Sequence, residues 1–116
     1  MEEVEGNREG EVSIERTSGS VFAALGYANA DEMERKSELV SAIAESIAAK
    51  GLSQVEAASI VGLDQPTLSK LLRGRTRSVS TDKLASMLNS LGRNVTIIVS
   101  EVSFGEQRGR TLVEVR

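Results

Sequence analysis

The sequence predicts a mainly α-helical domain that ends in a β-strand or hairpin. Three observations support this fold class. Apolar residues recur at helical spacing between residues 30 and 91. A glycine follows each of these apolar runs, as is typical of helix C-termini, and the periodicity changes to two after Asn94. With one Tyr, two Phe and no Trp, the core must be built from Leu, Ile, Val and Ala.

The first 28 residues carry weaker signals. Residues 1–20 are rich in glutamate and glycine and are too charged to pack, so we expect an acidic, flexible arm. Within it, the alternation of Val12 and Ile14 could form a short strand if another segment supplied an edge. The following run predicts a bend that docks three apolar side chains on the core, namely Val21, Phe22 and Leu25.

Four helices are expected after this bend. Asn29 and Glu32 have the spacing of a capping box, and residues 30–50 form the longest helix, with an apolar face made of Met33, Leu39, Val40, Ile43 and Ile47. The next three are short and are expected at residues 53–61, 64–73 and 80–91. Their caps are Ser53 with Glu56, Asp64 with Pro66 in the first turn, and Ser80.

The segment 94–116 is β-branched and alternating, with the runs VTIIVSEV and TLVEV around a glycine-containing loop. An isolated two-stranded hairpin is only marginally stable in water, so these strands need a partner surface. That surface could belong to the same chain or to a second subunit. We therefore divide the chain into an arm (1–20), a helical domain (21–93) and a C-terminal β segment that is a candidate dimerisation element (94–116).

Composition argues against several classes of function. The chain has no Cys and no His, which removes disulfides, thiolate nucleophiles, imidazole bases and the usual zinc ligands. We therefore expect no enzymatic activity, no metal and no cofactor. No run approaches the roughly 20 apolar residues of a membrane helix, and the N-terminus lacks a signal sequence, so we expect a cytoplasmic protein without membrane contact.

Charge is unevenly distributed along the chain. Residues 1–64 carry thirteen acidic and five basic residues, residues 65–93 carry one and six, and residues 94–116 carry three of each, within a net charge of -3. A phosphate backbone responds to charge within about 8 to 10 Å. The basic block at 65–93 is therefore a candidate footprint for nucleic acid despite the acidic total.

The helix expected at residues 64–73 has two different faces. On a helical wheel Leu68, Leu71 and Leu72 lie on one flank, and the opposite flank carries Pro66, Ser69, Lys70 and Arg73, with Gln65 and Thr67 at the margins. A nine-residue helix is about 13 Å long, close to the roughly 12 Å width of the DNA major groove. This helix and the preceding one, joined by a turn at Gly62, predict a helix-turn-helix motif.

The polar flank offers base-reading chemistry. Gln65 can make paired hydrogen bonds to adenine, Lys70 can donate to guanine, and Ser69 can donate or accept. Three arginines beyond the helix suit phosphate oxygens, namely Arg73, Arg75 and Arg77. Gln54 lies at a helix N-terminus, where free N–H groups favour an anion. A single exposed cation is ordinarily a solvated charge, so the prediction rests on the group.

At this point the sequence resembles the Cro and phage-repressor class, the Xre family. The resemblance covers Leu39 to Leu91 and rests on Ser53-Gln54, Ala57-Ala58, Val61-Gly62-Leu63, Thr67-Leu68-Ser69 and Arg73-Gly74. It implies a five-helix, lambda-repressor-like domain and a dimer on a two-fold symmetric DNA operator. It also implies base-edge positions at Gln65, Pro66, Thr67, Ser69 and Lys70, and backbone positions at Gln54, Arg75 and Arg77.

The flanking runs SGSVFAALGYANADE and LGRNVTIIVSEV resemble those of HigA-type antitoxins. This narrower resemblance implies autoregulation of an operon and neutralisation of a small, basic, RelE-like ribonuclease toxin. The chain departs from that family in its long acidic leader and in the extra run GRTLVEVR. The leader could occupy a cationic ribonuclease surface or could simply be a solubilising tail.

Two other functions remain open at this stage. A free-standing Xre-type regulator without a toxin partner would share residues 39–91. A protein-interaction module that has lost its DNA affinity would share the fold alone.

Overall fold

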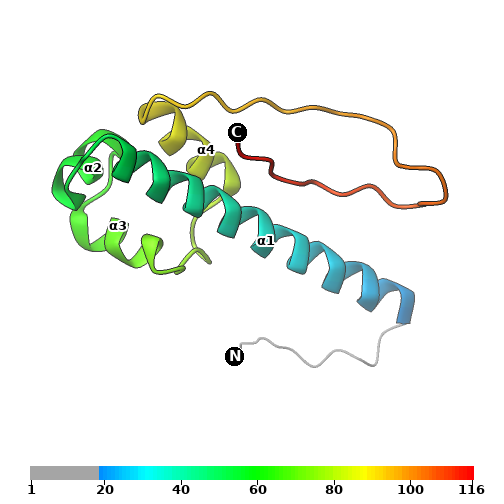
Figure 1. Ribbon diagram of the computed structural model, residues 1–116. Coiled ribbons are helices and arrows are strands. Elements are labelled where there is room, and N and C mark those ends of the chain that lie inside the picture. Colours follow the sequence, from blue (N-terminus) through cyan, green and yellow to red (C-terminus); the bar gives the residue numbers. More distant parts are fainter. Residues whose placement is uncertain (1–18) are drawn as a thin grey trace. The chain divides into compact units, whose positions relative to one another are not determined.

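The computed structural model describes residues 19–116, which contain four helices followed by a C-terminal segment without a strand (Figure 1). The helices are α1 (Gly19–Ala49), α2 (Gln54–Val61), α3 (Gln65–Leu72) and α4 (Thr81–Ser90). The acidic arm and the strand expected at Val12 and Ile14 lie almost entirely outside the described residues. By its contacts the chain divides into two units, one ending at Asp31 and one running from Glu32 to Arg116. The second unit contains the core and the predicted site.

Helix α1 differs from its prediction because it is continuous for 31 residues. The expected bend before Asn29 is wrong, and so is the capping box of Asn29 and Glu32, because both residues lie inside the helix. The run from Val21 to Ala30 is rich in alanine and has no proline, and Gly26 costs only about 1 kcal/mol relative to alanine. A cap residue needs an extended backbone, which a continuing helix does not provide. The docking expected of Val21, Phe22 and Leu25 concerns side chains outside the described set.

The core of the second unit is aliphatic. Its largest fully buried side chains come from α1, α3, α4 and the residue that ends α4: Ile43, Leu68, Leu71, Leu84, Met87 and Leu91. Helix α2 contributes Ala57, Ala58 and Val61, and two of these are small enough to allow close helix packing. The prediction for Leu39, Val40, Ile43 and Ile47 is confirmed. The prediction for Met33 is wrong, because its side chain is 71% exposed.

The predicted caps of the three short helices are confirmed. Ser53 and Glu56 form a reciprocal capping box at α2, with Glu56 N donating to Ser53 Oγ (3.1 Å) and Ser53 N donating to Glu56 Oε1 (2.9 Å). Gly62 ends α2 at φ 80°, a left-handed conformation that favours glycine. Asp64 caps α3 through Thr67 N (2.8 Å), and Ser80 caps α4. Because each cap is local in sequence, these boundaries are readable without the structure.

The fifth helix and the C-terminal β-strand or hairpin are not found among residues 19–116. The residues expected to form a bend before the first helix are part of α1 itself. Residues 94–116 have a strand-like sequence but no β-ladder, and a ladder requires a neighbouring edge at the right distance. Among the described helices none is long and apolar enough to cross a bilayer.

Candidate nucleic-acid interface

Helix α3 separates its apolar and polar residues as the sequence predicts. Leu68 is 0% exposed and Leu71 is buried beside it, whereas Leu72 is half-buried. The other flank carries Pro66, Thr67, Lys70 and Arg73 at the surface, with Ser69 partly exposed. Helix α2 packs against both α3 and α4, so it supports α3 from the side that carries the leucines. The polar flank is therefore accessible over the part of the chain that the structure describes.

The structure brings together Gln54 and Gln65, two site residues from different helices. Gln65 Nε2 donates to Gln54 Oε1 at 2.8 Å, between the first residue of α2 and the first residue of α3. This bond leaves Gln65 with its Oε1 acceptor and a second N–H, the pair of groups that an adenine edge requires. Gln54 keeps its Nε2 donors, which can bond a phosphate oxygen. The two amide side chains can thus bind a base edge and a neighbouring phosphate of the DNA backbone at the same time.

Ser69 and Arg73 form a second pair along the polar flank of α3. Arg73 Nη1 donates to Ser69 Oγ at 3.0 Å, one helical turn apart. The bond holds the guanidinium along the helix and leaves the serine hydroxyl hydrogen available to another acceptor. Lys70, between them in sequence, is exposed. The predicted base-reading residues therefore lie on one continuous surface.

The loop after α3 carries the remaining predicted phosphate ligands. Gly74 has φ 96°, a conformation that favours glycine, and it turns the chain so that Arg75 and Arg77 are both exposed. Between them Thr76 is half-buried, and its carbonyl oxygen accepts from Val79 N at 3.1 Å. The same oxygen accepts from Lys36 Nζ at 3.2 Å. Arg75 and Arg77 thus lie on either side of Thr76, whose carbonyl oxygen accepts two hydrogen bonds.

Lys36 is a supporting residue that the sequence analysis missed. It is 7% exposed, although it is charged, and its ammonium lies 3.5 Å from Glu32 one turn earlier in α1. Its position was detectable, because Lys36, Leu39, Val40, Ile43 and Ile47 share one helical period, which places a lysine on the inward face. Its partner Thr76 was not detectable, because forty residues separate the two.

Asp64, the N-cap residue of α3, has a lowered pKa. The pKa of the Asp64 carboxyl is lowered from its ordinary value of 3.8, first by a hydrogen bond with the Thr67 side chain, then by the Thr67 backbone N–H, and also by the positive charge of Lys70. Each of these interactions favours the ionised carboxylate, which is also stabilised by the N-terminal end of the helix dipole.

This shift predicts a pH dependence of stability. Because the pKa of Asp64 is lower in the folded chain than in the unfolded chain, its stabilising effect is complete above the unfolded value and is lost as pH falls through the folded value. We expect the unfolding midpoint of wild type to fall more steeply below about pH 4 than that of Asp64→Asn, which keeps a cap without a charge. Thermal melts from pH 2.5 to 7 measure this. Parallel curves for the two proteins would contradict the assignment.

The comparisons with known proteins agree with this geometry. The family profile of a helix-turn-helix domain matches residues 21–100. The chain belongs to this helix-turn-helix family. A solved structure described as an XRE family transcriptional regulator is similar to this chain, with a TM-score of 0.71 and 28% sequence identity. The match covers 76% of this chain and 99% of the chain in that structure. Among curated proteins none matches significantly.

As a helix-turn-helix protein, the chain has α2 and α3 as the two helices of the motif, with Gly62 in the turn between them. The wider resemblance to the Xre family is thus confirmed. Neither match names an antitoxin, so the narrower resemblance to HigA-type proteins stays a prediction. The roles of individual residues also remain predictions: the structure places all nine on the surface of α2, α3 and the following loop.

Proposed function

We propose that this helix-turn-helix protein is a non-enzymatic, sequence-specific transcriptional repressor that binds duplex DNA as a homodimer. The observation that carries the proposal is the exposed polar flank of α3, backed by Leu68 and Leu71 in the core. A side chain can read a base edge only if its helix projects from the fold. We also propose that the protein is cytoplasmic, because its proposed target is genomic DNA.

The residues that contact base edges lie in the first turn and on the polar flank of α3. Gln65, presented by Gln54, is suited to adenine, and Lys70 is suited to the O6 and N7 acceptors of guanine. Thr67 and Ser69 offer hydroxyls to neighbouring positions, and Pro66 offers an apolar contact to a thymine methyl group. These groups supply sequence preference rather than most of the affinity.

Affinity comes chiefly from the basic residues around α3. Residues 65–93 carry six bases and one acid, and Arg73, Arg75 and Arg77 are exposed around the end of α3. Each phosphate that a cation neutralises releases counterions, so the affinity falls as salt rises. The acidic residues among residues 1–64 make the total charge negative, whereas the block at 65–93 is basic.

The proposed DNA site is two-fold symmetric. One eight-residue α3 spans only a few base pairs, and a dimer places two such helices about 34 Å apart on successive major grooves. Doubling the contacts in this way gives the specificity that one short helix lacks.

We further propose that the repressor is the antitoxin of a toxin–antitoxin pair and neutralises a small, basic, RelE-like ribonuclease. The antitoxin proposal rests on two runs that flank the helix-turn-helix motif and resemble those of HigA-type antitoxins, SGSVFAALGYANADE and LGRNVTIIVSEV. A free-standing regulator without a toxin is the second candidate, and the solved relative described as a transcriptional regulator favours it. Co-expression with the product of the adjacent gene, followed by purification through a tag on this chain, separates the two. A basic protein of about 100 residues that copurifies and whose ribonuclease activity is inhibited would support the antitoxin role.

DNA binding itself is tested by the salt dependence of affinity. We expect log affinity to fall linearly with log salt, and Arg75→Ala or Arg77→Ala each to reduce the slope by about 1 while weakening all sequences alike. Lys70→Ala should instead relax base preference at a cost of about 1 to 3 kcal/mol. Fluorescence anisotropy on a selected operator and a scrambled duplex measures both effects. A flat salt response would indicate a protein-interaction module instead.

A further inference from the structure

The loop between α3 and α4 begins with a backbone arrangement that fixes Arg75 to α3. Gly74 N donates to the carbonyl oxygen of Leu71 at 2.9 Å. Arg75 N donates to the carbonyl oxygen of Lys70 at 3.1 Å. These two bonds form a Schellman motif, in which the residues after a helix close back on its last turn. The backbone of Arg75 is therefore held by α3 itself.

Arg77 belongs to a separate turn of the same loop. Val79 N donates to the carbonyl oxygen of Thr76 at 3.1 Å, which closes a turn with Arg77 at its second position. Val79, at the end of this turn, packs against the core. Thr76, at its start, is bound to α1, because its carbonyl oxygen also accepts from Lys36 Nζ at 3.2 Å. The start of the turn that carries Arg77 is thus held by α1, whereas Arg75 is held by α3.

Lys36 is placed to hold this turn rather than to bind DNA directly. It is 7% exposed, and its ammonium contacts the carbonyl oxygen of Thr76 and, at 3.5 Å, a carboxylate oxygen of Glu32. A buried charge is costly unless it is paired and hydrogen-bonded, and these two contacts meet that requirement. A phosphate would have to displace both of them. The effect of Lys36 on DNA must therefore pass through the loop.

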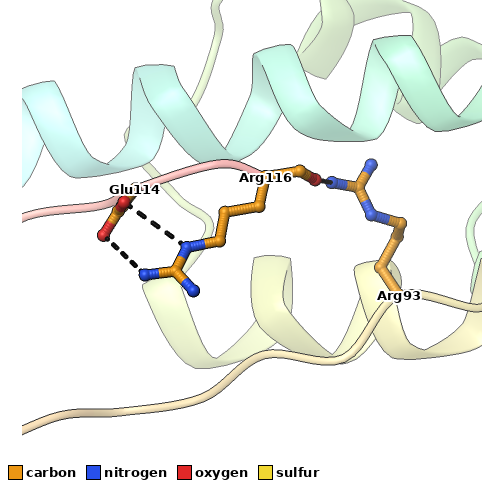
Figure 2. A network of polar contacts seen from close by, with 3 residues as sticks. All are labelled: Arg93, Glu114 and Arg116. Carbon is orange, nitrogen blue, oxygen red and sulfur yellow. Dashed lines mark hydrogen bonds and ion pairs between the residues drawn. The ribbon is translucent and has the colours of Figure 1, made fainter.

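The part of α1 that carries Lys36 is a fixed support. Ile43, further along the same face, is 0% exposed, and Ser46 Oγ accepts from Arg93 Nη1 at 2.9 Å. Arg93 Nη2 donates to the carbonyl oxygen of Arg116 at 3.1 Å, as Figure 2 shows. One guanidinium thus ties α1 to both the end of α4 and the C-terminal segment. A bond to this part of α1 therefore places the loop relative to the core.

We propose that Lys36 is a positioning residue for DNA binding that sets Arg77, but not Arg75, against a phosphate. The inference rests on the proposed function, in which both arginines neutralise phosphates. Loss of the bond from Lys36 frees the start of the turn that carries Arg77 and leaves the Schellman motif at Arg75 intact. An arginine on a loosened turn loses more conformational freedom when it binds, and this entropy cost weakens its contact. Lys36 therefore contributes to affinity through Arg77.

Lys36→Met removes the donor and keeps an unbranched side chain in the same space. The Thr76 carbonyl oxygen retains Val79 N as a donor, and Glu32 lies at the surface, so neither former partner of Lys36 is left buried and unsatisfied. We therefore expect the variant to fold, with the helical circular dichroism of wild type. Lys36→Ala, which places a strong helix former at the same position, is the second variant and should give the same results.

Salt-dependent anisotropy titrations on operator DNA measure the coupling of Lys36 to each arginine. We expect Lys36→Met to reduce the slope of log affinity against log salt by about 1, as Arg77→Ala does. The loss of affinity caused by Arg77→Ala should be at least about 3-fold smaller in the Lys36→Met background than in wild type. The loss caused by Arg75→Ala should be the same in both backgrounds within about 2-fold.

The matched control is Lys50→Met, which removes the same charge from an exposed lysine directly after α1. It should leave the effects of Arg75→Ala and Arg77→Ala unchanged within about 2-fold. If Lys36 acted only through its charge, it would couple to both arginines alike. Equal coupling to Arg75 and Arg77, or none to Arg77, would overturn the proposal.

NMR relaxation of the backbone amides tests the loop without DNA. We expect the order parameters of Arg77 and Ser78 to fall from about 0.85 in wild type toward about 0.6 in Lys36→Met, and that of Arg75 to stay at its wild-type value. Unchanged values at Arg77 would overturn the proposal. A wild type that binds no DNA would remove the repressor function, and the order parameters would still decide whether Lys36 holds the turn.

Discussion

Leu68→Ala is expected to lower the free energy of unfolding by about 2 to 5 kcal/mol. Leu68 is 0% exposed and lies at the centre of the inward face of α3, where Leu71 also packs into the core. The truncated side chain leaves a cavity that the surrounding Leu, Met and Ile side chains fill only in part, so the loss exceeds the simple transfer term. A small domain has only about 5 to 15 kcal/mol of stability, so this single change removes a large share. Urea denaturation followed by circular dichroism measures it.

Lys70→Ala is the matched control on the same helix. Lys70 is exposed and alanine is a strong helix former, so the free energy of unfolding should change by no more than about 0.5 kcal/mol. The two variants thus separate the two faces of α3: one should lose stability and the other should lose base preference. Equal unfolding midpoints for Leu68→Ala and Lys70→Ala would mean that α3 is not packed as described.

The parts of the fold that depend on neighbouring residues were predictable from the sequence. Helices α2, α3 and α4 begin at caps whose partners are three residues away, and α2 ends at a glycine with φ 80°. The start of α1 was not predictable in this way. A capping-box pattern at Asn29 offers a possible start, but the alanine-rich run before it allows the helix to continue, and continuation keeps every intrahelical hydrogen bond.

The features that the sequence missed depend on residues far apart in the chain. The C-terminal runs have strand composition, yet whether they form strands is decided by an edge that no local pattern specifies. The bond from Lys36 to Thr76 and the bond from Gln65 to Gln54 join residues from different elements, forty and eleven positions apart. Individual site residues could be proposed from the polar flank of α3, but their pairing could not.

Gln65→Ala is expected to weaken binding to the operator by about 1 to 3 kcal/mol, roughly 5- to 150-fold, and to relax preference at one base pair in each half-site. The loss should be much smaller on a scrambled duplex, because Gln65 makes no ionic contact with phosphate. Gln54→Ala should give a smaller loss on the operator, since it removes the acceptor that holds the Gln65 amide at 2.8 Å and one polar contact to the backbone. Anisotropy titrations at a fixed salt concentration measure each value.

The double variant Gln54→Ala/Gln65→Ala decides whether the two amides act as a unit. If Gln54 works through Gln65, its removal costs little once Gln65 is absent, and the cycle should show a coupling energy of about 0.5 kcal/mol or more. Lys83→Ala on α4 provides the comparison, because Lys83 is exposed on a helix that carries neither amide, and its effect should add to that of Gln65→Ala within about 0.3 to 0.5 kcal/mol. Additive losses for both pairs would mean that the hydrogen bond between α2 and α3 does not orient the base reader. The affinity of the site would then come from independent contacts.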